Sequence, residues 1–222
     1  MHNKKEKYFD WAIIALLAVL ILLVANNQVK LNNLSEMSAT GFAVATGVKT
    51  EVKTAEASVI PTGTPKIYGN ELGVAYDDIS PYDQQKADAT IRKLGSLDDA
   101  IQLSQDEMKR YISIASKISC EYCCGAQSII FSNGDAACGC AHSYAMRGVA
   151  KYLITKHPDE FTDDEILEEL GKWKTLFFPG QIQAKAQILS QNGVELNYIN
   201  LASNKYRGIE KGAAGSGMVG GC

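Results

Sequence analysis

The sequence has little net charge of either sign. Its 222 residues carry 22 lysines and arginines against 25 aspartates and glutamates, a net charge of −3. A protein that binds nucleic acid usually carries a basic field, so we expect no nucleic-acid partner. The sequence also has only one long apolar run, which excludes a membrane protein with many spans. Apolar residues, at 46%, are nevertheless too frequent for a wholly disordered chain.

The motifs of several enzyme classes are missing as well. The chain has no glycine-rich phosphate loop, no G-x-S-x-G, no H-E-x-x-H and no C-x-x-C-H haem-attachment motif. Its acidic residues do not have EF-hand spacing. The βαβ pattern of thioredoxin-like enzymes is also missing. These absences favour a protein that is not an enzyme, with its particular chemistry in the cysteines.

The one long apolar run lies near the N-terminus. Residues 11–25 contain no charged side chain, and a helix of that length spans roughly 22 Å, so interfacial residues must flank it to cross a membrane. Three lysines precede the run and only Lys30 follows it closely. The positive-inside rule then predicts a cytoplasmic N-terminus and an extracytoplasmic C-terminal part. We predict that residues 1–30 form a membrane anchor; the alternative is a signal peptide cut near Ala25.

The rest of the chain divides by composition into three parts. Residues 31–66 are rich in small residues and poor in aromatics, which predicts a flexible linker, with a pair of β-strands as the alternative. Residues 67–210 carry the helical signals and five of the six cysteines. Residues 211–222 form a glycine-rich segment that ends in Cys222, and we predict a flexible tail.

Helix signals dominate the folded part, so the predicted fold class is mainly α. Ser80 and Pro81 predict a helix start, and Gly95 predicts its end. Ser104 and Thr162 each begin a capping box, with a glutamate three residues later. Together with residues 142–156 and 181–191, these signals predict a small domain of five helices.

One segment between the helices predicts a β-hairpin that carries cysteines. Residues 128–131 and 136–138 have strand composition, and they flank Asn133-Gly134, the strongest short hairpin signal. A two-residue turn at this place would put Cys138 opposite Ile129. It would also bring the two groups of cysteines together.

Those cysteines have the spacing of metal ligands. C-x-x-C and C-x-C pairs each direct two sulfurs to one side, and two such half-sites joined by a hairpin are typical of a zinc ribbon. The surplus of donors also suits a soft ion such as Cu(I). Our predicted ligands are Cys120, Cys123, Cys138 and Cys140, with Cys124, His142 and Cys222 as additional donors or close partners.

Two other roles for the cysteines remain open. Structural disulfides persist outside the cytoplasm, where we expect this domain to lie. A redox-active pair is the second alternative, because a helix that begins near Ala141 would favour the thiolate form of the cysteines before it. For Cys222 the alternatives are a thiol without a role and a mobile ligand that the tail delivers to the cluster.

Longer motifs around the cysteines resemble those of known families. CEYCCG, the predicted hairpin and CGCAHSYAMRG resemble an uncharacterised family of membrane-anchored proteins of archaeal type. The resemblance extends over roughly residues 60–210 and implies a membrane-anchored protein without implying an activity. Cys138-Gly-Cys140 also resembles part of the bacterial PCYCGC motif, although Ala136 and Ala137 replace the first residues of that motif.

Overall fold

The computed structural model describes residues 59–211 and 217–221. The predicted membrane anchor, most of the predicted linker and Cys222 lie outside the described residues. Among those that are described, no helix is long and apolar enough to cross a membrane.

The described part of the chain is mainly helical, as the sequence predicts. Its elements, in chain order, are α2 (Gly69–Leu72), the 3-10 helix η1 (Tyr76–Asp78), α3 (Gln84–Ala100), α4 (Gln105–Ala115), α5 (Ala141–Lys156), α6 (Asp163–Phe177), α7 (Pro179–Gln191), α8 (Tyr198–Ala202) and the 3-10 helix η2 (Asn204–Tyr206). Both predicted capping boxes are present, at Ser104 before α4 and at Thr162 before α6.

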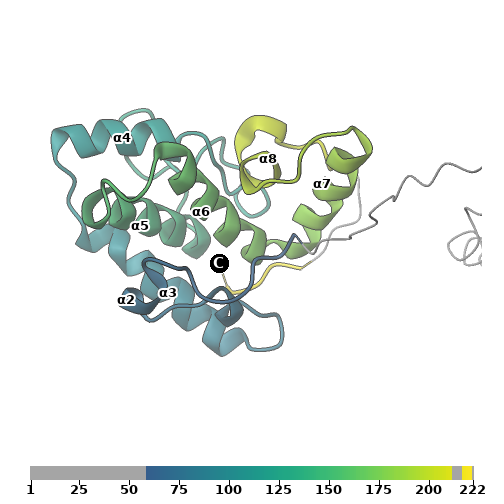
Figure 1. Cartoon of the computed structure of the whole chain (residues 1–222), viewed down its shortest axis with the longest axis horizontal. Coiled ribbons are helices and arrows are strands. Elements are labelled where there is room, and N and C mark those ends of the chain that lie inside the picture. Colours follow the sequence, from purple (N-terminus) through teal and green to yellow (C-terminus); the bar gives the residue numbers. More distant parts are fainter. Residues whose placement is uncertain (1–58, 212–216, 222) are drawn as a thin grey trace, which may run out of the picture. The chain divides into compact units, whose positions relative to one another are not determined.

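Helices α5 and α6 form the centre of the packing (Figure 1). α3 packs along α5, α4 contacts both central helices, and α7 and α8 pack against α6. α5 is buried on most of its circumference, since polar side chains as well as apolar ones are covered by its neighbours. The N-terminus of α5, which carries the last of the clustered cysteines, is therefore held in a fixed place by the core.

Helix α3 extends past its predicted end at Gly95 and stops at Ala100. It also begins at Gln84 with Asp83 as its N-cap, rather than at Ser80. Gly95 is buried, and a Cβ there would lie 3.2 Å from the Cβ of Tyr144. The glycine thus permits close contact between α3 and α5 instead of ending the helix, because tertiary packing outweighs its local preference.

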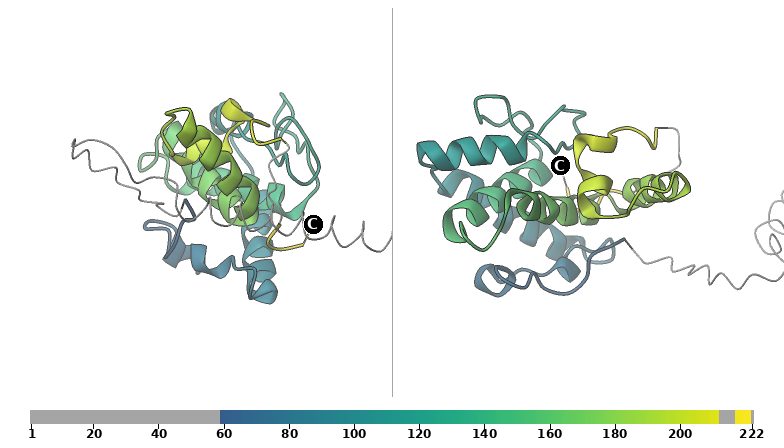
Figure 2. Two further views of the ribbon diagram at one scale, coloured as in Figure 1. Left: turned by 90° about the vertical axis from the view of Figure 1, so that its right-hand side faces the viewer. Right: turned by 45° about the horizontal axis from the view of Figure 1, so that its top comes forward.

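The predicted two-stranded hairpin is not formed as such, since the described residues contain no β-strand. A single isolated bridge joins Ile130 to Ala136, and Gly134 has a φ of 91°. The loop has three residues, with Phe131 N donating to Asp135 O at 2.7 Å, so the register differs by one from the predicted two-residue turn. Ala137 rather than Cys138 therefore lies opposite Ile129. Two further views show this connection between α4 and α5 as irregular loops (Figure 2).

Both ends of the described chain are packed more firmly than composition predicts. Pro61 and Pro65, in the last part of the predicted linker, are buried. At the other end, Val219 lies in the predicted flexible tail but is only 1% exposed. The domain therefore includes residues on both sides of the range 67–210.

Candidate metal centre

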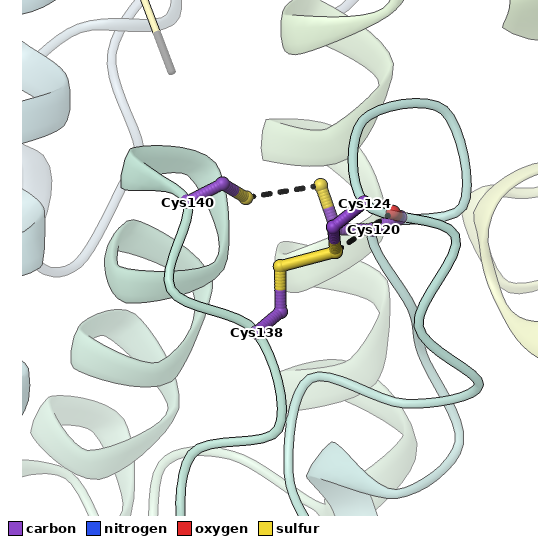
Figure 3. Close-up of side chains that lie close together, drawn as sticks. All are labelled: Cys120, Cys124, Cys138 and Cys140. Carbon is purple, nitrogen blue, oxygen red and sulfur yellow. Dashed lines mark hydrogen bonds between the residues drawn. A yellow bond between two sulfur atoms is a disulfide. The ribbon is translucent and has the colours of Figure 1, made fainter.

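Two loops bring four cysteine sulfurs together. Cys120 and Cys124 follow α4, while Cys138 and Cys140 directly precede α5 (Figure 3). The four Sγ atoms all lie within 4.8 Å of one another. Cys120, Cys138 and Cys140 are buried, whereas Cys124 is exposed and opens the group to solvent on one side. The arrangement is thus a compact sulfur cluster with one accessible member.

The four cysteines differ in their redox state. Cys124 and Cys138 form a disulfide, which joins the two loops. Cys120 and Cys140 are free thiols, with their sulfurs 3.3 Å apart. A disulfide and a dithiol therefore lie side by side in this structure. The disulfide can take electrons from a thiol partner and the dithiol can give them to a disulfide partner, while reduction of the disulfide would supply four thiols in one place.

Cys140 is the N-cap of α5, and this position determines its chemistry. Its sulfur accepts a hydrogen bond from the backbone N–H of Ser143 at 3.4 Å. The pKa of the Cys140 thiol is lowered by a hydrogen bond from Cys120 and, against the opposing effect of burial, by hydrogen bonds from His142 and Ser143. The pKa of Cys120 is raised, because the two sulfurs share one proton and Cys120 keeps it. Cys140 is therefore the thiolate of the pair, the form that binds metal or attacks a disulfide.

A buried arginine fixes the second loop. Arg147 on α5 is 1% exposed and donates from Nη1 to the carbonyl of Cys138 at 2.9 Å. Its Nε forms an ion pair with Asp98 on α3 at 2.6 Å. The guanidinium thus ties Cys138 to the interface of α3 and α5, and places a positive charge close to the cluster.

A second group of buried charges follows Cys120 in the chain. The carboxylate of Glu121 contacts Lys174 at 3.0 Å and Lys185 at 3.1 Å. Burial alone would raise the pKa of Glu121, but the two lysines hold it below its usual value. Burial lowers the pKa of Lys174 to about 8, in spite of the nearby carboxylate. Lys185 also contacts the buried Glu210 at 3.4 Å, so two buried lysines and two buried carboxylates form a charge network beside the loop that carries Cys120 and Cys124.

The dimensions of the sulfur cluster fit a tetrahedral metal site. Zinc binds cysteine sulfur at about 2.3 Å, so the edges of a tetrahedral site measure about 3.8 Å between sulfurs. The sulfurs here already lie within 4.8 Å of each other, and small side-chain rotations would suffice to reach the tetrahedron. Thiolates are the ligands, so the Cys124–Cys138 bond must be reduced before all four can bind.

The remaining predicted site residues lie outside this group. Cys124, rather than the predicted Cys123, belongs to the four close sulfurs, and the imidazole of His142 is not among their ligand atoms. His142 is fully buried and stacks against Phe177 and Phe178, with ring centroids 4.8 and 5.0 Å away. It lies in the first turn of α5, two residues after the N-cap residue Cys140. Cys222 lies outside the described residues.

Sequence reasoning did not identify the supporting polar residues. Arg147, Lys174 and Lys185 lie on helices at positions where charged side chains are usually exposed. Only for Arg147 did the sequence indicate burial, because this residue lies between Met146 and Val149 on a helix that is mostly apolar. The role of Ser143 follows from its place three residues after Cys140, the usual spacing between an N-cap side chain and the amide that it binds.

Comparisons with known proteins do not assign this chain to a family. The chain matches no protein-family model, no curated protein and no solved structure. The motif resemblances described from the sequence therefore remain expectations. Within the residues that the structure describes, the four close sulfurs and the groups that surround them form the candidate functional site.

Proposed function

We propose that this protein binds a thiophilic metal ion, Zn(II) or Cu(I), through the thiolates of Cys120, Cys124, Cys138 and Cys140. The observation that carries the proposal is the convergence of four sulfurs, from two separate loops, within 4.8 Å. No other residue type contributes a ligand atom to that group. Four thiolates with no open position are typical of a closed, structural zinc site, and a soft sulfur set is also what Cu(I) prefers.

The surrounding charges support a site of this kind. Four thiolates around Zn(II) carry a net charge of roughly −2, which is costly to bury without compensation. Arg147 binds the backbone of the second cysteine loop, and Lys174 lies buried beside the first. Both cations lower the electrostatic cost of holding thiolates in the interior. An apolar setting would instead favour neutral thiols.

The proposal includes a location and a mode of delivery. The lysine asymmetry around residues 11–25 supports an anchored protein with its cysteine domain outside the cytoplasm. There a closed zinc site would stabilise the fold, while a Cu(I) site would buffer or deliver copper at the cell envelope. Cys124 is the exposed member of the set, and it is the ligand through which a metal ion would enter or leave.

A thiol–disulfide redox function is the second candidate. It is favoured by the Cys124–Cys138 disulfide beside the free Cys120 and Cys140. In such a reaction, the thiolate of a partner protein attacks the exposed Cys124 sulfur and Cys138 leaves as a thiolate. A second partner thiolate then attacks the mixed disulfide, releasing Cys124 and leaving the partner oxidised. A third role, a domain stabilised only by disulfides, would leave the free pair unused.

Metal titration of single-cysteine variants tests the proposal. The full chain in detergent is reduced, freed of metal under anaerobic conditions and titrated with Co(II), whose charge-transfer absorption reports the number of bound thiolates. We expect one ion per chain with the spectrum of a tetrathiolate site. Replacement of any of the four cysteines by serine should weaken binding by at least tenfold and change that spectrum.

Cys123→Ser is the matched control. Cys123 is adjacent to Cys124 in the chain but lies outside the group of four sulfurs. Its replacement should leave the stoichiometry and the spectrum unchanged. A reduced wild-type chain that binds no metal would refute the metal-binding function. A reversible dithiol couple near the potential of glutathione in that metal-free chain would support the redox function instead.

A further inference from the structure

The C-terminal segment docks beside the site. We call residues 217–221 the strap. At its centre Val219 is 1% exposed, and its N–H donates to the carbonyl of Phe177, the last residue of α6, at 2.9 Å. Its carbonyl accepts a hydrogen bond from Nε2 of His142 at 2.9 Å. The strap is thus bonded through its backbone to two of the central helices.

The end of the strap is bonded to a third helix. Gly220 N–H donates to Oε1 of Gln84 at 3.1 Å, and Gly221 N–H donates to Oδ1 of Asp88 at 2.9 Å. Both acceptors lie in the first turns of α3. Four directed hydrogen bonds over three consecutive residues indicate a specific binding cradle rather than a loose end of the chain.

Gly220 is the residue that this cradle requires. Its φ is 82°, in the left-handed region that favours glycine. A Cβ at this position would lie 2.3 Å from Cδ1 of Ile91 and 3.6 Å from Nε2 of His142. The backbone conformation therefore disfavours any side chain at this position, and a Cβ would in addition require the end of the Ile91 side chain to move. Gly221, by contrast, has open space where a Cβ would lie.

The contact with His142 connects the strap to the metal centre. A carbonyl oxygen can only accept, so Nε2 of His142 carries the hydrogen of this bond. Histidines at metal centres commonly donate one ring N–H to a backbone carbonyl, and this fixes the orientation of the other nitrogen. The ring is stacked against Phe177 and Phe178. His142 lies in the first turn of α5, next to Ser143, whose backbone N–H donates to the sulfur of the N-cap residue Cys140.

We propose that the strap is a regulatory clamp that holds His142 and the first turn of α5, of which Cys140 is the N-cap, and so slows release of the metal ion from the four-thiolate site. This inference rests on the proposed metal-binding function. Docking of the strap holds the imidazole in place, and undocking exposes Nε2 and loosens the first turn of α5, whose Ser143 N–H donates to the sulfur of Cys140. His142 is a positioning residue in this scheme. Cys222 follows the strap directly, but its thiol is not needed.

The test compares rates of zinc release in the reduced full chain. Zn(II) is loaded, a chromogenic chelator is added in excess, and the rate of transfer is measured. Deletion of residues 217–222 and the variant Gly220→Ala should each speed release at least tenfold, the usual size of an effect from a residue that supports a metal ligand. Gly221→Ala and Cys222→Ser should release zinc at the wild-type rate, because neither removes a strap hydrogen bond.

A second readout separates positioning from general loss of structure. The Nε2 proton of His142 should give a slowly exchanging NMR signal in the wild type and in Gly221→Ala, and the deletion should abolish it. In a His142→Gln background the deletion should have no further effect on release, since both changes remove the same contact.

The outcomes of the test are distinct. A reduced wild-type chain that binds neither Zn(II) nor Cu(I) refutes the proposed function itself. A chain that binds zinc and releases it at the same rate with and without the strap overturns the clamp. An effect of Cys222→Ser equal to that of the deletion also overturns it, because the tail would then act by supplying a thiol.

Discussion

At the scale of single residues, loss of the buried ion pair of Arg147 should destabilise the fold more than loss of an exposed ion pair. Its guanidinium neutralises Asp98 and also binds the carbonyls of Cys138 and Ile129. Removing the guanidinium leaves the carbonyl of Cys138 without this donor and takes one of two cations from Asp98. Such losses cost more than an intact pair contributes, because the desolvation of the remaining groups is no longer offset.

Arg147→Met should therefore lower the free energy of unfolding by about 3 kcal/mol. This is the lower end of the usual range, because Lys151 still contacts Asp98 at 2.7 Å. Urea denaturation of the full chain in detergent measures the change. The control is Lys109→Met, which breaks the exposed pair with Asp106 and should cost at most about 1 kcal/mol. Equal effects of the two substitutions would contradict the assignment.

At the scale of elements, the interface of α3 and α5 depends on a glycine in the middle of a helix. Gly148 lies inside α5, where alanine would ordinarily be favoured by about 1 kcal/mol. A Cβ at Gly148 would lie 2.0 Å from the carbonyl oxygen of Leu94. No rotation of a side chain can relieve this contact, because both atoms are fixed by the backbones of the two helices.

Gly148→Ala should thus destabilise the fold by several kcal/mol in spite of its better helix propensity, and it should shift Tm downward by at least about 5 °C. Circular dichroism during heating provides the measurement. The matched substitution is Gly139→Ala, where a Cβ would meet nothing within 4 Å and Tm should change little. A Gly148→Ala chain with unchanged or higher Tm would show that the two helices are not in this close contact.

The same interface explains which elements the sequence could predict. The capping boxes at Ser104 and Thr162 are local patterns, and both helices begin where those patterns place them. Gly95 has the local signal of a helix end, yet its role is set by Tyr144, far away in the chain.

Residue spacing could identify the cysteine cluster. Spacing favoured Cys123 over Cys124 as a main ligand, but the path of the irregular loop, which spacing does not predict, brings the sulfur of Cys124 to the other three.

At the scale of the whole molecule, the docking of the strap could not be predicted from the sequence, because it too depends on residues far away in the chain. A glycine-rich segment has no hydrophobic period, so composition predicts a flexible tail. Its docking depends on backbone N–H and C=O groups, which every residue has, and on acceptors from α3 and α6. Only the assembled helices create those acceptors in one place.

The proposed membrane anchor gives a prediction at the same scale. The lysines before residues 11–25 favour a single N-terminal span with the cysteine domain outside. Protease added to intact cells should then degrade the domain, while a cytoplasmic marker protein stays intact. Protection of the domain until the cells are lysed would reverse the orientation, and would place its thiols in a reducing compartment.

The central claim is that four thiolates of one chain hold one metal ion. Elemental analysis combined with thiol counting tests it most directly, on the full chain purified anaerobically with reductant, which is removed before the assay. We expect one zinc or copper ion per chain, and slow alkylation of Cys120, Cys124, Cys138 and Cys140 until a chelator is added. A chain without metal, in which all four thiols react at once with the alkylating agent, would contradict the account.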